Sequence, residues 1–143
     1  MVINLQPLIV LMVFSLSFEL LKKRALSFLR DARFDLESGD YDLALFHAEQ
    51  FAQLYSKYLL YRRIGDFPKT PHLVRLLRDL SKVYNDCRLK ELLDRNLEGI
   101  YLLEEAYIST RYLPREYDRD IALRILALCE RLMEVFNCLE SRS

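Results

Sequence analysis

Apolar residues recur every three or four positions along most of the chain, and this spacing predicts a series of amphipathic helices. The first is expected over residues 18–38 and the second over residues 41–64. Between them, Gly39 can take the left-handed conformation that ends a helix, and Asp40 can cap the helix that follows. The sequence therefore predicts two antiparallel helices joined by a tight turn.

More helices are expected in the second half of the chain. Thr70 followed by Pro71 indicates a helix start, because proline fits the first helical position, so a helix is predicted over residues 71–84. Longer apolar patterns predict helices over residues 89–110 and 118–139. With only 3 glycines and 4 prolines in 143 residues, the chain lacks the frequent turns of a β-sandwich. We expect an all-α fold, an antiparallel up-and-down bundle of four to five helices.

Small and apolar residues predict how these helices pack. Ala44, Ala48 and Ala52, at successive four-residue steps, allow a neighbouring helix to approach closely, and Gly99 marks a kink or a point of close contact. The last helix carries two adjacent apolar lines, more than one bundle contact requires, so we expect it to form a homodimer. The two lines are Ile121, Ile125, Leu128, Leu132, Val135 and Leu139, and Leu126, Cys129, Met133 and Phe136.

Residues 1–17 are expected to form an apolar tail ahead of a single domain over residues 18–143. The apolar run from Leu8 to Phe18 is too short to cross a bilayer. Positive charges follow this run rather than precede it, which is not the pattern of a secretory signal. Met12 is an alternative start of the chain. We expect no association with a membrane.

Charge and cysteine content narrow the classes of function. The 21 basic and 21 acidic residues balance, so contact with nucleic acid requires a local basic patch. Cys87, Cys129 and Cys138 lie mostly within helical patterns and lack the C-x-x-C spacing of zinc and redox sites. We interpret them as buried thiols in a reducing cytoplasm. We expect a cytoplasmic protein with no metal ion and no cofactor.

Five segments, in order, resemble the HEPN domain family, in particular its stand-alone archaeal and bacterial members. They are Phe-Leu-Arg-Asp-Ala-Arg at 28–33, Gly-Asp-Tyr-Asp-Leu-Ala at 39–44, Phe-His-Ala-Glu-Gln at 46–50 with Ala52 and Lys57, Phe-Pro-Lys-Thr at 67–70 with His72, and Tyr-Ile-Ser-Thr-Arg-Tyr at 107–112. The resemblance implies a helical bundle that commonly forms a dimer. It also implies a minimal nucleotidyltransferase as partner, sometimes in a toxin–antitoxin pair. The family includes metal-independent ribonucleases, nucleotide-binding or regulatory members, and members without catalysis.

The ribonucleases of this family carry an arginine followed four to six residues later by a histidine, near the start of the final long helix. Arg111 matches the arginine, but residues 115–118 read Arg-Glu-Tyr-Asp and contain no histidine. Cleaving RNA without a metal ion needs one group to take the 2′-hydroxyl proton and another to protonate the leaving oxygen, and histidine can do either near neutral pH. In the alternative enzyme reading, Glu116 or Tyr117 replaces that histidine.

A cleft for a nucleotide, RNA or a partner protein is expected where the fourth helix pattern stops at a proline. Its candidate residues are Tyr107, Arg111, Tyr112, Arg115, Glu116 and Tyr117. The structural alternative is that Arg111 satisfies the carbonyl groups of the last helical turn while Tyr112 covers an apolar edge.

His47, Lys57 and His72 are weaker candidates for this site. The alanine-rich surroundings of His47 favour a hydrogen-bonded packing role, and His72 either pins its loop or joins an anion site at a helix start. The sequence thus predicts a HEPN-type module without the ribonuclease motif. It is expected to bind a nucleotide, RNA or a partner nucleotidyltransferase.

A further basic group, Arg75, Arg78 and Lys82, shares one face of the third predicted helix. It is interpreted as a solvated face. A nucleic-acid surface would need these residues to join Arg111, Arg115 and Arg119 in one stripe.

Overall fold

The computed structural model describes residues 6–112 and 116–142, with side chains described except at residues 8, 10–16 and 110–112. The described chain is helical and contains no strand. Its elements are α1 (Gln6–Ser38), α2 (Tyr41–Ile64), α3 (Leu73–Tyr84), α4 (Leu89–Arg95), α5 (Leu97–Tyr112) and α6 (Arg119–Arg142). This architecture confirms the predicted all-α helical bundle.

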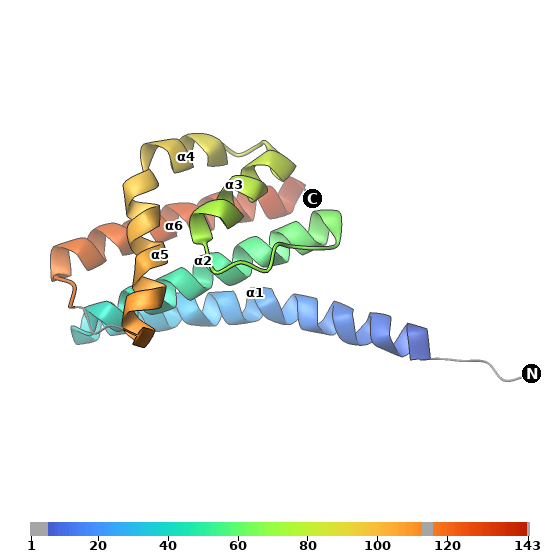
Figure 1. Ribbon diagram of the computed structural model, residues 1–143, viewed down its shortest axis with the longest axis horizontal. Helices are drawn as coiled ribbons and strands as arrows, with labels where there is room; N and C mark the ends of the chain where they lie inside the picture. Colours follow the sequence, from blue (N-terminus) through green and yellow to red (C-terminus); the bar gives the residue numbers. More distant parts are fainter. Residues whose placement is uncertain (1–5, 113–115, 143) are drawn as a thin grey trace, which may run out of the picture.

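Three long helices, α1, α2 and α6, form one layer of the molecule (Figure 1). α1 and α2 run antiparallel, and α6 runs in the same direction as α2. Tyr55 on α2 stacks on Phe136 of α6 with ring centroids 5.0 Å apart. Arg33 on α1 makes a bidentate ion pair with Glu130 on α6, with both N–O distances at 2.6 Å. The predicted alanine stripe on α2 is fully buried in this layer.

The shorter helices cover this layer, and α5 lies across it rather than along it (Figure 1). Tyr107 on α5 stacks on Phe46 of α2 with ring centroids 6.0 Å apart. Gly99 is the point where α5 meets α6, because a Cβ atom at this position would lie 3.1 Å from Leu128 Cδ2. The prediction of a close contact at Gly99 is confirmed.

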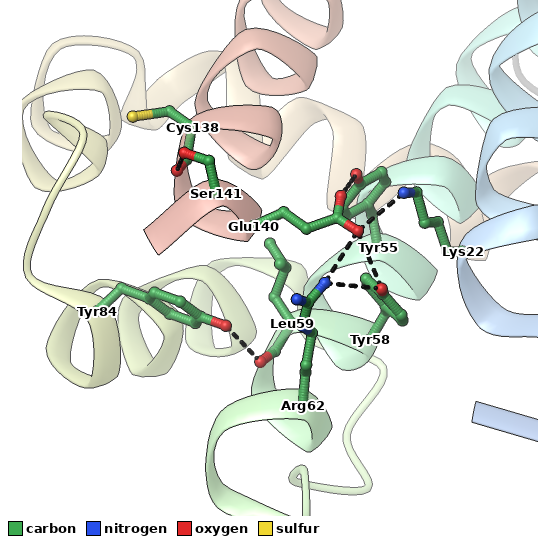
Figure 2. Close-up of polar contacts among 9 residues, drawn as sticks. All are labelled: Lys22, Tyr55, Tyr58, Leu59, Arg62, Tyr84, Cys138, Glu140 and Ser141. Atoms are coloured by element: carbon green, nitrogen blue, oxygen red, sulfur yellow. Dashed lines mark hydrogen bonds and ion pairs between the residues drawn. The ribbon is translucent and has the colours of Figure 1, made fainter. Parts of the chain in front are cut away.

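Glu140, near the end of α6, holds the three long helices together (Figure 2). Its carboxylate accepts hydrogen bonds from Lys22 on α1 at 2.8 Å, and from Tyr55 and Tyr58 on α2 at 2.6 and 2.9 Å. Arg62 donates a further bond at 3.1 Å. Burial alone would raise the pKa of Glu140, but these donors lower it, so the carboxylate is ionised at neutral pH.

Several helix boundaries differ from those expected. α1 begins at Gln6 rather than at residue 18, because the apolar run contains no helix breaker and Pro7 is tolerated in a first turn. Its first turns extend past the other helices (Figure 1). α3 begins at Leu73 rather than Pro71, since the Thr70 hydroxyl accepts the His72 N–H in a local turn. The start of the chain at Met12 stays a prediction.

The helix predicted over residues 89–110 is divided at Asn96. The Asn96 side chain donates to the Leu92 carbonyl, and the Asn96 backbone N–H is shared between the carbonyls of Leu92 and Leu93. These bonds end α4, and α5 starts in a new direction. The expected turn between α1 and α2 is confirmed at Gly39, which has a φ of 80°, but the Asp40 side chain makes no capping hydrogen bond to α2.

The two apolar lines on α6 are covered within the chain itself. Their residues are buried or half-buried against the other helices. The surplus of apolar surface that suggested a dimer is therefore accounted for by contacts with α1, α2 and α5. The homodimer stays a prediction, without this argument in its favour.

The interpretation of all three cysteines as buried thiols is wrong for two of them. Cys87, in the connection between α3 and α4, forms a disulfide with Cys138 on α6. The partners are 51 positions apart in sequence, and only the path of the chain through α3 and α4 brings them together. Cys129 is a buried free thiol, as expected. Among the described residues, no helix is long and apolar enough to span a membrane.

Candidate functional site

The predicted cleft at the end of α5 is only partly described. Arg111 and Tyr112 belong to the last turn of α5, but their side chains, and the whole of Arg115, lie outside the described residues. Tyr117 is buried, and its hydroxyl hydrogen-bonds with Ser109 on α5 at 3.1 Å. Tyr117 therefore anchors the connection between α5 and α6.

Glu116 lies in an acidic recess. The recess is lined by Glu116, Tyr117 and the turn that contains Asp40 and Asp42. Three carboxylates among these lining residues would repel a phosphate group. The recess beside Glu116 is therefore acidic, and it is unlike a phosphate site.

Tyr107 instead contributes to a different groove, between α2, the connection over residues 65–72, and α5. We call it the lysine groove. It encloses about 330 Å³, and its lining includes Gln50, Gln53, Lys57, Phe67, Lys69 and Tyr107. This volume lies at the small end of the usual range for ligand pockets.

Two lysines give the lysine groove its charge. Lys57 is half-buried, with its ammonium nitrogen 5.8 Å from the centre of the Phe67 ring, and desolvation lowers its pKa. Lys69 is exposed at the edge of the groove. Within the described chain, neither lysine has a carboxylate within ion-pair distance. Both cations are consequently available to an anion.

Two buried polar residues, Glu49 and Gln53, precede Lys57 on α2 at four-residue steps. Glu49 is completely buried and accepts a hydrogen bond from the Gln50 amide at 2.9 Å. Burial raises the pKa of Glu49 to about 8, so its carboxyl group is mostly protonated at neutral pH. It therefore does not cancel the charge of Lys57.

Gln53 is also buried, with 5% of its surface exposed, and its amide nitrogen donates to the Pro71 carbonyl at 2.9 Å. Among the described atoms, neither Gln53 Oε1 nor Glu49 Oε2 has a hydrogen-bond partner. Buried polar atoms without partners are rare in native proteins and indicate a place for water or a ligand.

Other basic residues are already engaged. Lys22 and Arg62 bind the Glu140 carboxylate (Figure 2). Arg63 lies over the Tyr84 ring, with its guanidinium carbon 4.7 Å from the ring centre. Lys57 and Lys69 make no ion pair with a described carboxylate, although Lys57, like Arg63, lies near an aromatic ring.

A second groove continues from the lysine groove, and we call it the arginine groove. It lies between α3 and α5, and its lining includes His72, Arg75, Arg78, Lys82, Tyr101 and Glu104. The two grooves adjoin, because Pro71 of one precedes His72 of the other, and Tyr107 lies one helical turn beyond Glu104. The basic face predicted on α3 thus borders the lysine groove.

The two histidines have structural contacts. His47 Nδ1 lies 2.5 Å from Asp35 Oδ2, and its ring stacks on Phe28. These contacts agree with the packing role predicted for His47. His72 is exposed, with Nδ1 3.4 Å from Glu104 Oε1, although this contact lacks hydrogen-bond geometry.

Comparison with known families decides the classification of the chain. The sequence model of the HEPN domain matches residues 18–139. The chain belongs to the HEPN domain family. A comparison with curated proteins gives no match.

Most residues of the lysine groove that are named above belong to segments that resemble the HEPN family. Gln50, Lys57, Phe67, Lys69 and Tyr107 come from three of these segments, and the fold brings them to one groove. Lys57 and Tyr107 were thus among the predicted site residues.

Gln53 and Glu49 were missed, because a single glutamine and a single glutamate on a helix carry no signal until their burial is known. Arg111, the match to the HEPN ribonuclease arginine, has no histidine in the expected interval after it.

Proposed function

We propose that this HEPN protein binds the phosphate and base of a nucleotide, either free or within RNA, in the lysine groove. One observation carries the proposal: Lys57 and Lys69, two cations without ion-pair partners in the described chain, flank a groove lined by aromatic rings and side-chain amides. Lysine ammonium groups bind phosphate as point charges. Aromatic side chains provide surfaces for bases, and amides provide polar contacts to base edges.

We further propose that the protein does not cleave RNA. Tyr117 has its hydroxyl bonded to Ser109, and Glu116 lies among carboxylates. Glu49 is mostly protonated at neutral pH, but it is completely buried and out of reach of a substrate. None of these three residues is therefore placed to act as an exposed acid or base in RNA cleavage. Incubation with total RNA tests this, and cleavage by the wild type but not by Arg111→Ala would contradict it.

A thermal-shift panel of nucleoside monophosphates and short oligoribonucleotides tests the binding proposal. A ligand present at a hundredfold excess over its Kd should stabilise the fold by about 2.7 kcal/mol. Lys57→Ala and Lys69→Ala should reduce the shift. Lys23→Ala, which removes an exposed lysine on α1, should not change it. If no ligand in the panel shifts the melting temperature, the proposal is wrong.

The HEPN family also suggests a minimal nucleotidyltransferase partner and a toxin–antitoxin role. These stay predictions, together with the homodimer and the cytoplasmic location. Co-purification of the tagged native protein, followed by mass spectrometry, is the test for a partner. A recovered nucleotidyltransferase would support the pairing, and recovery of the HEPN protein alone would count against it.

A further inference from the structure

We infer that Gln53 makes the lysine groove selective for a base that carries the 6-amino group of adenine or the corresponding amino group of cytosine, where guanine and uracil carry a carbonyl oxygen. This inference rests on the proposed function and deepens it. Gln53 would act on specificity rather than on affinity for phosphate, which we assign to Lys57 and Lys69.

The orientation of the Gln53 amide is fixed by its neighbour. Its nitrogen lies 2.9 Å from the Pro71 carbonyl oxygen, which can only accept a hydrogen bond. The NH₂ end of the amide must therefore face Pro71, and the alternative amide orientation would place two acceptors together. The carbonyl oxygen, Oε1, is the end that is left to receive a donor.

Gln53 Oε1 accepts no hydrogen bond from the described residues. The atom is buried. Gln53 nevertheless lines the lysine groove, between Gln50 and Lys57 on the same helix. A ligand that brings an N–H group to this position would satisfy the acceptor, and burial would strengthen the bond.

The chemistry of the bases then determines the preference. Adenine and cytosine present an exocyclic NH₂ group, which is a donor, whereas uracil presents a carbonyl oxygen at the corresponding position. A carbonyl opposite Gln53 Oε1 would leave two buried acceptors facing each other. A free glutamine amide can accept a hydrogen bond from the adenine amino group and donate one to an adenine ring nitrogen. The Gln53 NH₂ group already donates to Pro71, so only its carbonyl oxygen can contact the base, and it would accept from the amino group.

The contact with Glu49 provides the competing account. Gln53 lies within hydrogen-bonding reach of Glu49. If protonated Glu49 donates to Gln53 Oε1 permanently, the acceptor is satisfied inside the protein. In that case Gln53 would support the fold but would not select a base.

Calorimetric titration with two ligands separates these accounts. Adenosine 5′-monophosphate and purine riboside 5′-monophosphate differ only in the 6-amino group. The wild type should bind the adenosine ligand about tenfold more tightly, the value of one hydrogen bond to a buried acceptor. Equal affinities would overturn the inference alone. Absence of binding by either ligand would overturn both the inference and the proposed function.

Two variants complete the test. Gln53→Met keeps the length of the side chain and removes the acceptor, so the two ligands should bind with equal affinity. Lys57→Met should lower the affinity for both ligands and leave the ratio of the two affinities unchanged. If Gln53→Met does not fold, the comparison of cytidine with uridine 5′-monophosphate on the wild type replaces it, and equal affinities there would contradict the inference.

A short oligoadenylate titrated in parallel with the mononucleotide identifies the source of the base. Tighter binding by the oligomer would indicate RNA, and equal binding would indicate a free nucleotide. Both results support selection by Gln53 if oligouridylate binds more weakly than oligoadenylate. Equal binding of the two oligomers would count against it.

Discussion

At the scale of single residues, burial determines the chemistry of the lysine groove. Glu49 and Lys57 lie two helical turns apart on α2, and both are removed from water. Desolvation raises the pKa of the Glu49 carboxyl to about 8 and lowers the pKa of Lys57. Since Glu49 is mostly neutral at neutral pH, its carboxyl group does not neutralise the positive charge of the groove.

Replacing Glu49 with glutamine should change the pH dependence of folding. The folded protein keeps the Glu49 proton up to about pH 8, whereas the unfolded chain releases it near pH 4.5. The contribution of Glu49 to the free energy of unfolding is therefore greatest below pH 4.5 and falls by about 1.4 kcal/mol per pH unit as the pH rises to 8. Glu49→Gln should lack this contribution and should be more stable than the wild type near pH 8.

Denaturant unfolding at a series of pH values across this window measures the effect. The difference between the wild type and Glu49→Gln should grow with pH and level off above pH 8. Parallel curves for the two proteins would show that Glu49 ionises normally in the folded state.

At the scale of helices, the sequence predicted the elements better than their arrangement. The bounds of α2 and the end of α1 agree with prediction, because periodicity, Gly39 and Gly65 mark them clearly. The break at Asn96 was missed, since the apolar pattern continues through it and only local hydrogen bonds of its side chain and backbone end α4.

The break at Asn96 also decides where Tyr107 lies. A single helix over residues 89–110 suggests a cleft at its end, near residues 111–117. A separate α5 that crosses α2 instead brings Tyr107 to the lysine groove. Crossing angles depend on tertiary packing and are not contained in the periodicity of one helix.

The disulfide between Cys87 and Cys138 should stabilise the attachment of the α3–α4 connection to α6. It closes a segment of 51 residues, and the chain-entropy model gives about 4 kcal/mol for a loop of this length. The Cys87→Ser and Cys138→Ser variants should each have a free energy of unfolding that is lower by this amount, because each removes the same bond. Denaturant unfolding measures the difference. Cys129→Ala serves as a control variant that leaves the disulfide in place.

Counting thiols in the unfolded, unreduced protein is the direct check. The disulfide predicts one reactive thiol per chain, from Cys129. Three reactive thiols, together with a midpoint of unfolding that reductant does not change, would contradict the bond.

At the scale of the whole molecule, the balance of charge hides a local concentration of cations. The chain has no net charge, yet the adjoining grooves contain Lys57 and Lys69 in one and Arg75, Arg78 and Lys82 in the other. Arg75 lies 3.9 Å from Asp79, whereas Arg78 and Lys82 have no ion pair within the described residues. An RNA strand bound in the lysine groove could extend along this path.

Arg78→Ala therefore distinguishes a strand from a single nucleotide. The variant should weaken binding of an oligoribonucleotide and lower the dependence of log Kd on log salt by about one unit, while leaving a mononucleotide unaffected. Lys90→Ala, at an exposed position on α4, is the matched control. An oligomer that binds the wild type and Arg78→Ala equally would confine the ligand to the lysine groove.

The most direct test of nucleotide binding is calorimetric titration of adenosine 5′-monophosphate into the wild type, Lys57→Met and Lys23→Met. Loss of a charged hydrogen bond to phosphate should weaken binding to Lys57→Met by about tenfold to hundredfold. Lys23→Met should bind like the wild type. Equal affinity of Lys57→Met and the wild type, or no heat of binding in the wild type, would contradict a nucleotide site in the lysine groove.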